Sequence, residues 1–254
     1  MITMKRILLI AATVALASCN FLGLSYHIGN GVSVDTAIEV EEFDSISAGC
    51  SLDVVYTQSA QSQSVVLTCD ENLVEFFNIR VEEGTLRIGT KPGTSINTKV
   101  KSYVTIVSPK ISSIKASGSG DIEITSPLVT DSEFSFKVSG SGDIEADEVV
   151  TCKDFTCTVS GSGNIEVAGV LAESASFKDS GSGDIEVDAL TAEDISVKIS
   201  GSGDITLKCQ NAGYIDASLS GSGDLVLSGS ARSVQSNITG SGRVNSKNLT
   251  IIRQ

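Results

Sequence analysis

A four-residue motif, Ser-Gly-Ser-Gly, recurs through the second half of this chain at a nearly constant interval. It begins at Ser117, Ser139, Ser160, Ser180, Ser200 and Ser220, and a variant Thr-Gly-Ser-Gly begins at Thr239. Successive copies are 22, 21, 20, 20, 20 and 19 residues apart. A regular period of this length is the signature of a solenoid, in which each repeat buries its apolar face by stacking on its neighbours.

The repeat spanning 180–199 shows what each unit forms. Apolar and polar residues alternate over 184–187 and again over 195–199, which is the period of a half-buried strand. The sequence therefore predicts an all-β, single-stranded parallel β-helix with coils of about 20 residues. The usual crossover rule makes its coils right-handed. A flexible Gly/Ser linker does not explain four-residue copies flanked by strands, and a calcium-binding β-roll would need a nine-residue period.

The motif is expected to form one corner of each coil. A sharp corner repeated at the same place favours glycine, since we expect backbone angles there that other residues adopt at a cost. The small serine between the two glycines is expected to stack and to hydrogen-bond to the serines above and below it. The corner glycines are Gly118, Gly120, Gly140, Gly142, Gly161, Gly163, Gly181, Gly183, Gly201, Gly203, Gly221, Gly223, Gly240 and Gly242.

The first residues resemble a secretory signal. Lys5 and Arg6 precede an apolar run that is too short for a permanent membrane span, and Leu16-Ala17-Ser18-Cys19 follows it. This is the pattern of a lipobox, which is cut before a cysteine that then becomes acylated. We therefore expect residues 1–18 to be a lipoprotein signal peptide, Cys19 to carry the lipid (palmitate among its acyl chains), and residues 19–33 to form a tether.

Residues 34–110 have strand patterns without the motif. We expect an irregular β region that caps the regular β-helix of residues 111–254; a separate β-sandwich is the alternative. Within it, Asp70 is placed to cap a short helix over 70–77, and Gly84 to form a hairpin turn between Val81 and Leu86. The last repeat carries Arg243 and further polar residues, which suit an end that must resist polymerisation.

Charge and composition exclude several functions. Removal of residues 1–18 takes away Lys5 and Arg6 and leaves 16 basic against 31 acidic residues, a net charge of −15. Such a chain repels nucleic acid. The single histidine argues against histidine catalysis and multi-histidine metal sites, and we expect no cofactor.

Two acidic columns run along the predicted stack. An aspartate follows the corner at 121, 143, 184, 204 and 224, with Asn164 inside the column, and glutamates recur at 123, 145, 166 and 186. The structural interpretation is a solvated turn column that accepts backbone N–H bonds. The alternative is a row of weak calcium sites, for which one carboxylate per coil is sparse, so we predict no metal site. Lysines two residues before the corner, at 115, 137, 178 and 198, are expected to flank and screen the aspartates.

Five cysteines lie beyond Cys19. Cys50 and Cys69 are symmetric about a turn near 59–63, and an oxidising envelope would allow a cross-strand disulfide between them. Cys152 and Cys157 align with inward positions and are expected to be buried thiols. The state of Cys209 is left open.

Several segments resemble one known family. Ile28-Gly-Asn-Gly31, Val40-x-x-Phe43-x-x-Ile46, Leu52-Asp-Val54, Val81-x-x-Gly84-x-Leu86-x-Ile88 and the repeated Ser-Gly-Ser-Gly-Asp-Ile are similar to the head-GIN-domain putative auto-transporter adhesins, common as lipoproteins of Bacteroidota. The resemblance implies a β-helical envelope protein and supplies no catalytic residues.

The leading functional hypothesis is a non-enzymatic lipoprotein of the outer membrane, on its periplasmic or surface face, that presents a rigid face to an envelope, host or glycan ligand. The alternatives are a self-associating structural scaffold, hence a homo-oligomer, and a carbohydrate-active β-helix enzyme. The repeated acids argue against the enzyme, because an active site is a local break in a repeat. A binding site is therefore expected where the repeat breaks, in residues 34–110 or around Asn164.

Overall fold

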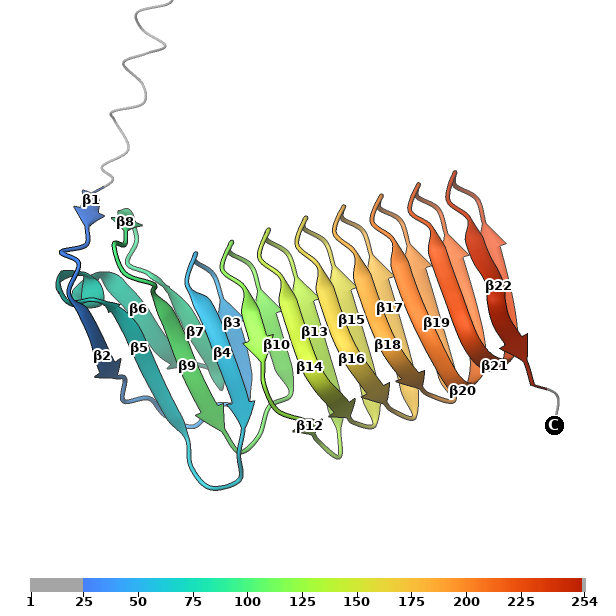
Figure 1. The fold of residues 1–254 in the computed structure, drawn as a ribbon, viewed down its shortest axis with the longest axis horizontal. Coiled ribbons are helices and arrows are strands. Elements are labelled where there is room, and N and C mark those ends of the chain that lie inside the picture. The colour runs from blue at the N-terminus through green and yellow to red at the C-terminus, as the bar shows by residue number, and fades with distance from the viewer. Residues whose placement is uncertain (1–24, 253–254) are drawn as a thin grey trace, which may run out of the picture.

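The protein is a two-sheeted stack of parallel coils, closed at one end by an irregular β region (Figure 1). The structure, a computed structural model, describes residues 25–252. Residues 1–24, with Cys19 and most of the predicted signal and tether, lie outside the described residues, as do 253–254. No helix in the described part is long and apolar enough to cross a membrane.

Each coil consists of one strand before the Ser-Gly-Ser-Gly corner and one strand after it. Sheet 1 contains the strands before the corners: β3 (Ser45–Ala48), β10 (Ser113–Ala116), β13 (Glu133–Val138), β15 (Asp154–Val159), β17 (Ser174–Asp179) and β19 (Asp194–Ile199). Sheet 2 contains the strands after them: β4 (Asp53–Gln58), β11 (Ile122–Ile124), β14 (Ile144–Thr151), β16 (Ile165–Leu171) and β18 (Ile185–Thr191), with the short β12 (Leu128–Val129) beside β14. The long strands β20 (Ile205–Leu219) and β21 (Leu225–Ile238) run through both sheets, and β22 (Val244–Ile251) ends sheet 2. The predicted parallel β-helix is confirmed.

The register follows the repeat, so equivalent residues stack in columns. Ile122, Ile144, Ile165, Ile185 and Ile205 are successive partners in sheet 2, and all are buried. In sheet 1 two inward columns contain aromatic rings, and the centroids of Phe155 and Phe177, one from each column, are 5.8 Å apart. Cys152 and Cys157 are buried as predicted, and Cys209 is buried as well.

The corner glycines are required by close packing rather than by backbone angle. None of them has a positive φ, so the conformational reason given above is wrong. A Cβ added to any of the fourteen would lie 1.9–2.2 Å from a carbonyl oxygen of the preceding coil. The first corner, Gly49-Cys50-Ser51-Leu52, has no corner before it in the stack, and it has Cys50 and Leu52 where later corners have glycine.

The corner serines also bond differently from the prediction. The first serine donates to a backbone carbonyl of the preceding coil in four corners, as Ser117 Oγ does to Ala48 O at 3.1 Å. The second serine is exposed on the outer ridge. No hydrogen bond joins corner serine side chains within the described residues.

The N-terminal region caps the stack, as expected, and forms no separate sandwich. Strands β7 (Thr85–Thr90) and β9 (Tyr103–Ser108) continue sheets 1 and 2 in parallel beside β3 and β4. Antiparallel strands then cover them: β6 (Phe77–Glu82) on β7, β5 (Ser64–Asp70) on β9 and β2 (Ser33–Ala37) on β5. A separate parallel pair, β1 (Ser25–Ile28) and β8 (Thr94–Asn97), lies where the described chain begins, and we call this place the chain entry. Residues 25–33, expected in the tether, therefore belong to the fold, and the first coil already begins at β3.

Three local predictions in the cap have different outcomes. The hairpin is confirmed, with Glu83 and Gly84 at positive φ between β6 and β7. The short helix is a 3-10 helix, η2 (Glu71–Phe76), and the side chain of Asp70 does not cap it. The Cys50–Cys69 disulfide is wrong: both thiols are free, because β9 lies between β4 and β5 and separates the two segments.

The glycine contacts make a testable prediction. Gly163→Ala would place a Cβ 2.1 Å from the carbonyl oxygen of Gly142, and we expect it to lower the free energy of unfolding by about 3 kcal/mol in chemical denaturation. Gly89→Ala is the control, because no atom lies within 4 Å of its added Cβ. Equal stability of the two variants would contradict the packing account.

Candidate functional site

A ladder of side-chain-to-backbone hydrogen bonds runs along sheet 2, directly after the corners. Oδ1 of each ladder residue except the last, Arg243, accepts from the backbone N–H of the equivalent residue in the next coil, at 2.6–3.2 Å. The members, in order, are Asp53, Asp121, Asp143, Asn164, Asp184, Asp204, Asp224 and Arg243. The structural interpretation of the column is confirmed, although the donor lies in the next coil rather than in the same turn. Asn164 takes part because its amide oxygen accepts equally well.

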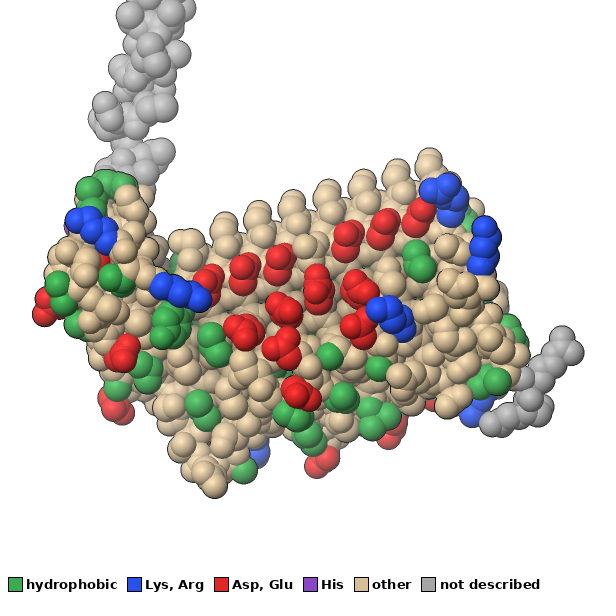
Figure 2. Space-filling model, in the orientation of Figure 1, with side chains coloured by type: hydrophobic (Ala, Val, Ile, Leu, Met, Phe, Trp, Pro, Cys, Tyr) green, Lys and Arg blue, Asp and Glu red, His purple; other side chains and the backbone are tan. Residues whose placement is uncertain are grey.

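The ladder occupies one oxygen of each carboxylate and leaves the other toward solvent. Among the described residues, the second oxygens of Asp121, Asp143, Asp184 and Asp204 accept no hydrogen bond. At the last coil the guanidinium of Arg243 bonds Oδ2 of Asp224 at 2.9 Å, and this side-chain bond, with the Arg243 backbone N–H, lowers the pKa of Asp224. The row of red side chains in Figure 2 marks this acidic edge.

A second acidic column lies beside the ladder. Glu123, Glu145 and Glu166 are partners in adjacent strands, with side chains toward solvent. Partial desolvation and the carboxylates of Asp147, Glu166, Glu123 and Asp143 raise the pKa of Glu145. We call the two columns together the acidic face.

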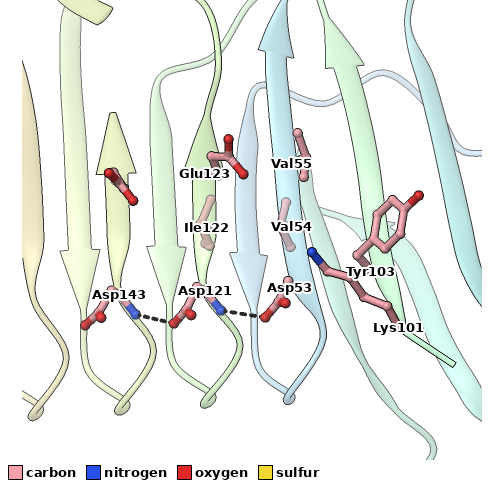
Figure 3. A pocket seen from close by; sticks show the side chains of 10 residues that line it. Asp53, Val54, Val55, Lys101, Tyr103, Asp121, Ile122, Glu123 and Asp143 are labelled. Atoms are coloured by element: carbon pink, nitrogen blue, oxygen red, sulfur yellow. Dashed lines mark hydrogen bonds between the residues drawn. The ribbon is translucent and has the colours of Figure 1, made fainter. Parts of the chain in front are cut away.

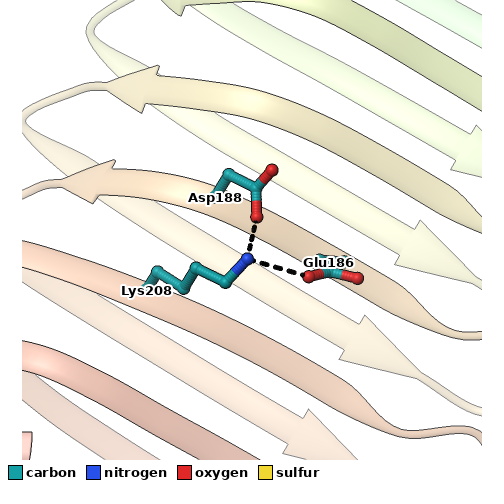
Figure 4. A network of polar contacts seen from close by, with 3 residues as sticks. All are labelled: Glu186, Asp188 and Lys208. Carbon is teal, nitrogen blue, oxygen red and sulfur yellow. Dashed lines mark hydrogen bonds and ion pairs between the residues drawn. The ribbon is translucent and has the colours of Figure 1, made fainter.

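One lysine neutralises part of this face toward its C-terminal end. Lys208 Nζ lies 3.2 Å from Glu186 Oε1 and also bonds Asp188 (Figure 4). The bonds to Asp188 and then Glu186 raise the pKa of Lys208. Near the cap, no carboxylate of the two columns forms an ion pair within residues 25–252.

The acidic face becomes a pocket where the first coils meet the cap (Figure 3). The cavity is about 460 Å³ in volume, and we call it the junction pocket. Its lining comes from β4, β11 and β14 and from the cap: Asp53, Val54, Val55, Lys101, Tyr103, Asp121, Ile122, Glu123, Asp143 and Glu145. Five carboxylates thus face one ammonium, and the Lys101 Nζ lies 6.0 Å from the centroid of the Tyr103 ring.

The junction pocket lies where the repeat breaks, which is where the sequence predicts a binding site. Its acids belong to the predicted columns, but Lys101 and Tyr103 were not predicted. They precede and begin β9, whose position beside β4 closes the pocket. The one signal in the sequence was that no corner motif precedes the strand pattern that begins at Tyr103.

The lysine column does not screen the aspartates through ion pairs. Lys115 and Lys137 are partners in sheet 1, and Lys178 and Lys198 are partners farther along it. Among the ion pairs of residues 25–252, none includes any of these four side chains. The two columns are separated by the corner and lie on different sheets.

Asp70 is a fully buried carboxylate that holds the cap together. It accepts backbone N–H bonds from Gly31 at 2.6 Å, Lys99 at 2.9 Å and Val100 at 3.3 Å. Burial opposes its ionisation, but these three bonds and the Lys99 charge outweigh burial and lower its pKa. Gly29 must lack a side chain because its Cβ would lie 2.2 Å from the Asp70 carboxyl carbon.

Asp179 is a second buried carboxylate, and it is poorly satisfied. It occupies a core column of sheet 1 in which its partners are Val159 and Ile199. Its Oδ1 accepts from the Gly181 N–H at 2.9 Å, whereas Oδ2 is buried without a hydrogen-bond partner. Desolvation, which outweighs the bonds from corner N–H groups, raises the pKa of Asp179.

Among the described residues, no group of three or more His, Cys, Asp and Glu side chains is arranged to hold a metal ion. The fold and this face together define a class: a two-sheeted parallel β-solenoid with an acidic, pocketed face. Residues 42–221 and 180–253 match the family described as "Putative auto-transporter adhesin, head GIN domain". The chain belongs to this family, as the sequence resemblance indicated.

Solved structures support the same assignment. A putative adhesin from Bacteroides fragilis NCTC 9343 is 26% identical, with a TM-score of 0.76 over 86% of this chain and 99% of the other. A putative lipid binding protein from Parabacteroides distasonis ATCC 8503 is 26% identical, with a TM-score of 0.74 over 87% and 99%. A putative adhesin from the same organism is also 26% identical, with a TM-score of 0.70 over 87% and 99%. The chain matches no curated protein.

Because the pKa of Asp179 is raised, replacing this residue should change the free energy of unfolding by an amount that depends on pH. Asp179→Val should raise the free energy of unfolding at pH 7 by about 2 kcal/mol, because it removes a buried, poorly paired carboxylate. The folded chain holds the Asp179 proton more tightly than the unfolded chain. The ionisation cost is therefore absent below the ordinary carboxyl pKa of about 3.9, grows as the pH rises from there to the folded value, and is complete above it.

Denaturation series at pH 4 and pH 7 would measure this difference. Ile199→Val, in the same core column, is the control and should cost about 1 kcal/mol at both pH values. The account is wrong if Asp179→Val gains no more stability at pH 7 than at pH 4.

Proposed function

We propose that this chain is a lipid-anchored, non-enzymatic outer-membrane adhesin whose junction pocket binds cationic groups of a partner. Membership of the adhesin family supports an envelope location and a binding role. The lipobox Leu16-Ala17-Ser18-Cys19 supports acylation at Cys19. More than one acyl chain gives a stable anchor, so the folded rod would stay at the membrane.

The observation that carries the binding proposal is the composition of the junction pocket. Asp53, Asp121, Asp143, Glu123 and Glu145 converge there around a single lysine. The ladder holds the aspartates in fixed positions, so a ligand does not have to order them. The Tyr103 ring offers a surface over which a ligand cation can lie, as Lys101 does at 6.0 Å.

A ligand with ammonium or guanidinium groups suits this chemistry best. Free second oxygens recur one coil apart, at about 4.8 Å. An extended Lys- or Arg-rich segment of a partner protein could place successive cations along such a row. The net charge of −15 after signal removal would steer that segment toward the protein and make association sensitive to salt.

The same regularity argues against catalysis at this face. Asp121, Asp143, Asp184 and Asp204 have equivalent bonding on successive coils, so none is distinguished as an acid or base. The pKa of Glu145 is raised by partial desolvation and by a row of like charges. The repeat alone explains such a row of carboxylates, so the raised pKa of Glu145 does not indicate a catalytic residue.

The anchor can be tested by metabolic labelling. In a Gram-negative host, the full-length chain should incorporate labelled palmitate and sediment with membranes, whereas Cys19→Ser should lose the label and appear in the soluble fraction. Retention of the label in Cys19→Ser would contradict the assigned attachment site. Protease treatment of whole cells then distinguishes the surface face from the periplasmic face.

The pocket can be tested with a charge-matched pair of variants. The pocket variant is Asp53→Asn/Asp121→Asn/Glu123→Gln, and the control is Asp184→Asn/Asp204→Asn/Glu166→Gln. Asparagine keeps the ladder bond, as Asn164 does, so both variants should fold. Fluorescence anisotropy with a labelled Lys/Arg-rich peptide should show roughly tenfold weaker binding for the pocket variant, about 1.4 kcal/mol, and a smaller loss for the control.

Raising the salt concentration should weaken peptide binding to the unmodified protein. Equal losses in the two variants would mean that overall charge, and not the junction pocket, attracts the peptide. No binding by the unmodified protein would reject a cationic ligand.

A further inference from the structure

Exposed apolar side chains are concentrated where the chain enters the fold. Nine large hydrophobic side chains of the described residues are exposed, and three of them lie within seven residues of each other. Tyr26 is 60% exposed, and Ile28 and Val32 are each 51% exposed. Apolar groups gathered in this way often mark a contact surface.

The local structure presents these groups outward. Tyr26 and Ile28 lie on the same face of β1 because side chains alternate along a strand. His27, between them, points the other way and stacks on Phe76, with ring centroids 3.6 Å apart. The Tyr26 hydroxyl accepts a hydrogen bond from Asn97 Nδ2 at 3.0 Å, which fixes the polar end while the ring stays exposed.

Two exposed lysines flank this segment. The Ser25 N–H donates to Gly93 O at 2.8 Å, which places the turn containing Lys91 beside the chain entry. The Lys99 side chain passes 4.0 Å from where a Cβ on Gly31 would lie. Neither lysine has an ion-pair partner among residues 25–252. Acidic groups near this segment are Glu71 and Glu75 of η2, the buried Asp70, and Asp35 of β2, whose Oδ1 accepts a hydrogen bond from the Thr68 hydroxyl at 2.7 Å.

An aromatic ring, aliphatic side chains and unpaired lysines are the combination that suits a phospholipid surface. Tyrosine favours the membrane–water interface, and lysine is attracted to anionic headgroups. The acidic face, in contrast, would be repelled by such a surface. The side chains around β1 therefore suit a phospholipid surface, whereas those of the acidic face do not.

The chain between Cys19 and β1 is so short that a lipid on Cys19 must lie close to this segment. Six residue steps separate Cys19 from Ser25, which span at most about 21 Å when fully extended. The eight corners of the stack, at about 4.8 Å each, extend over about 34 Å. A bilayer holding the Cys19 lipid is therefore always near β1.

We propose that Tyr26, Ile28 and Val32, with Lys91 and Lys99, form a membrane-contact patch that rests on the phospholipid headgroup surface. The proposal rests on acylation of Cys19, and it adds an orientation: the cap contacts the membrane and the last coil is free. In Figure 1, β1, which contains Tyr26 and Ile28, is at the upper left.

Tryptophan fluorescence can test the contact, because the chain contains no tryptophan. Lipidated Tyr26→Trp, reconstituted into phosphatidylethanolamine/phosphatidylglycerol vesicles, should lose emission when the lipids are brominated and shift to shorter wavelength. Lipidated Tyr214→Trp is the matched control: Tyr214 is 53% exposed in β20, far along the stack, and should show neither change. Adding Ile28→Ser and Val32→Ser to Tyr26→Trp should reduce the quenching.

Flotation of the vesicles separates the two proposals. If Tyr26→Trp floats with the vesicles but is quenched no more than Tyr214→Trp, the contact patch is wrong and the anchor stands. If the protein fails to float, the anchor is wrong and the orientation with it. A thermal melt of each variant should match the unmodified chain, which shows that quenching reports position and not unfolding.

Discussion

The contact between successive corners is the constraint on which the rest of the structure depends. Each corner glycine lies so close to a carbonyl oxygen of the preceding coil that a single added carbon would overlap it, at 1.9–2.2 Å. This contact keeps the corners in register. Because the corners are in register, the isoleucines behind them form a continuous core column, and the acids after them form the ladder. Packing, not turn geometry, explains the motif.

The ladder connects this constraint to function. One carboxylate oxygen ties each coil to the next, and the other remains available to solvent. Where the stack is regular, the result is an acidic edge; where the first coil meets the cap strand β9, acids of the same columns line the junction pocket with Lys101 and Tyr103. The structural repeat thus provides most of the proposed binding groups. The pocket around them forms where the repeat ends, beside Lys101 and Tyr103.

The sequence predicted what the repeat determines and little of what the cap determines. The period placed the strands, the buried Cys152 and Cys157 and the acidic columns, because each follows from stacking identical units. It did not show that β9 separates β4 from β5, which removes the Cys50–Cys69 pairing. Nor did it show that Asp70 gathers three N–H groups from distant loops. Such contacts join segments far apart in the chain and have no periodic signal.

The most direct test of this account compares Asp184→Asn with Asp184→Ala in chemical denaturation. If the column is first a hydrogen-bond ladder, asparagine should retain the stability of the unmodified chain, as Asn164 already does within it. Alanine should lose about 1–2 kcal/mol, because the Asp204 N–H would lose its acceptor. Equal losses for asparagine and alanine would contradict the account, since the column would then depend on charge rather than on the bond between coils.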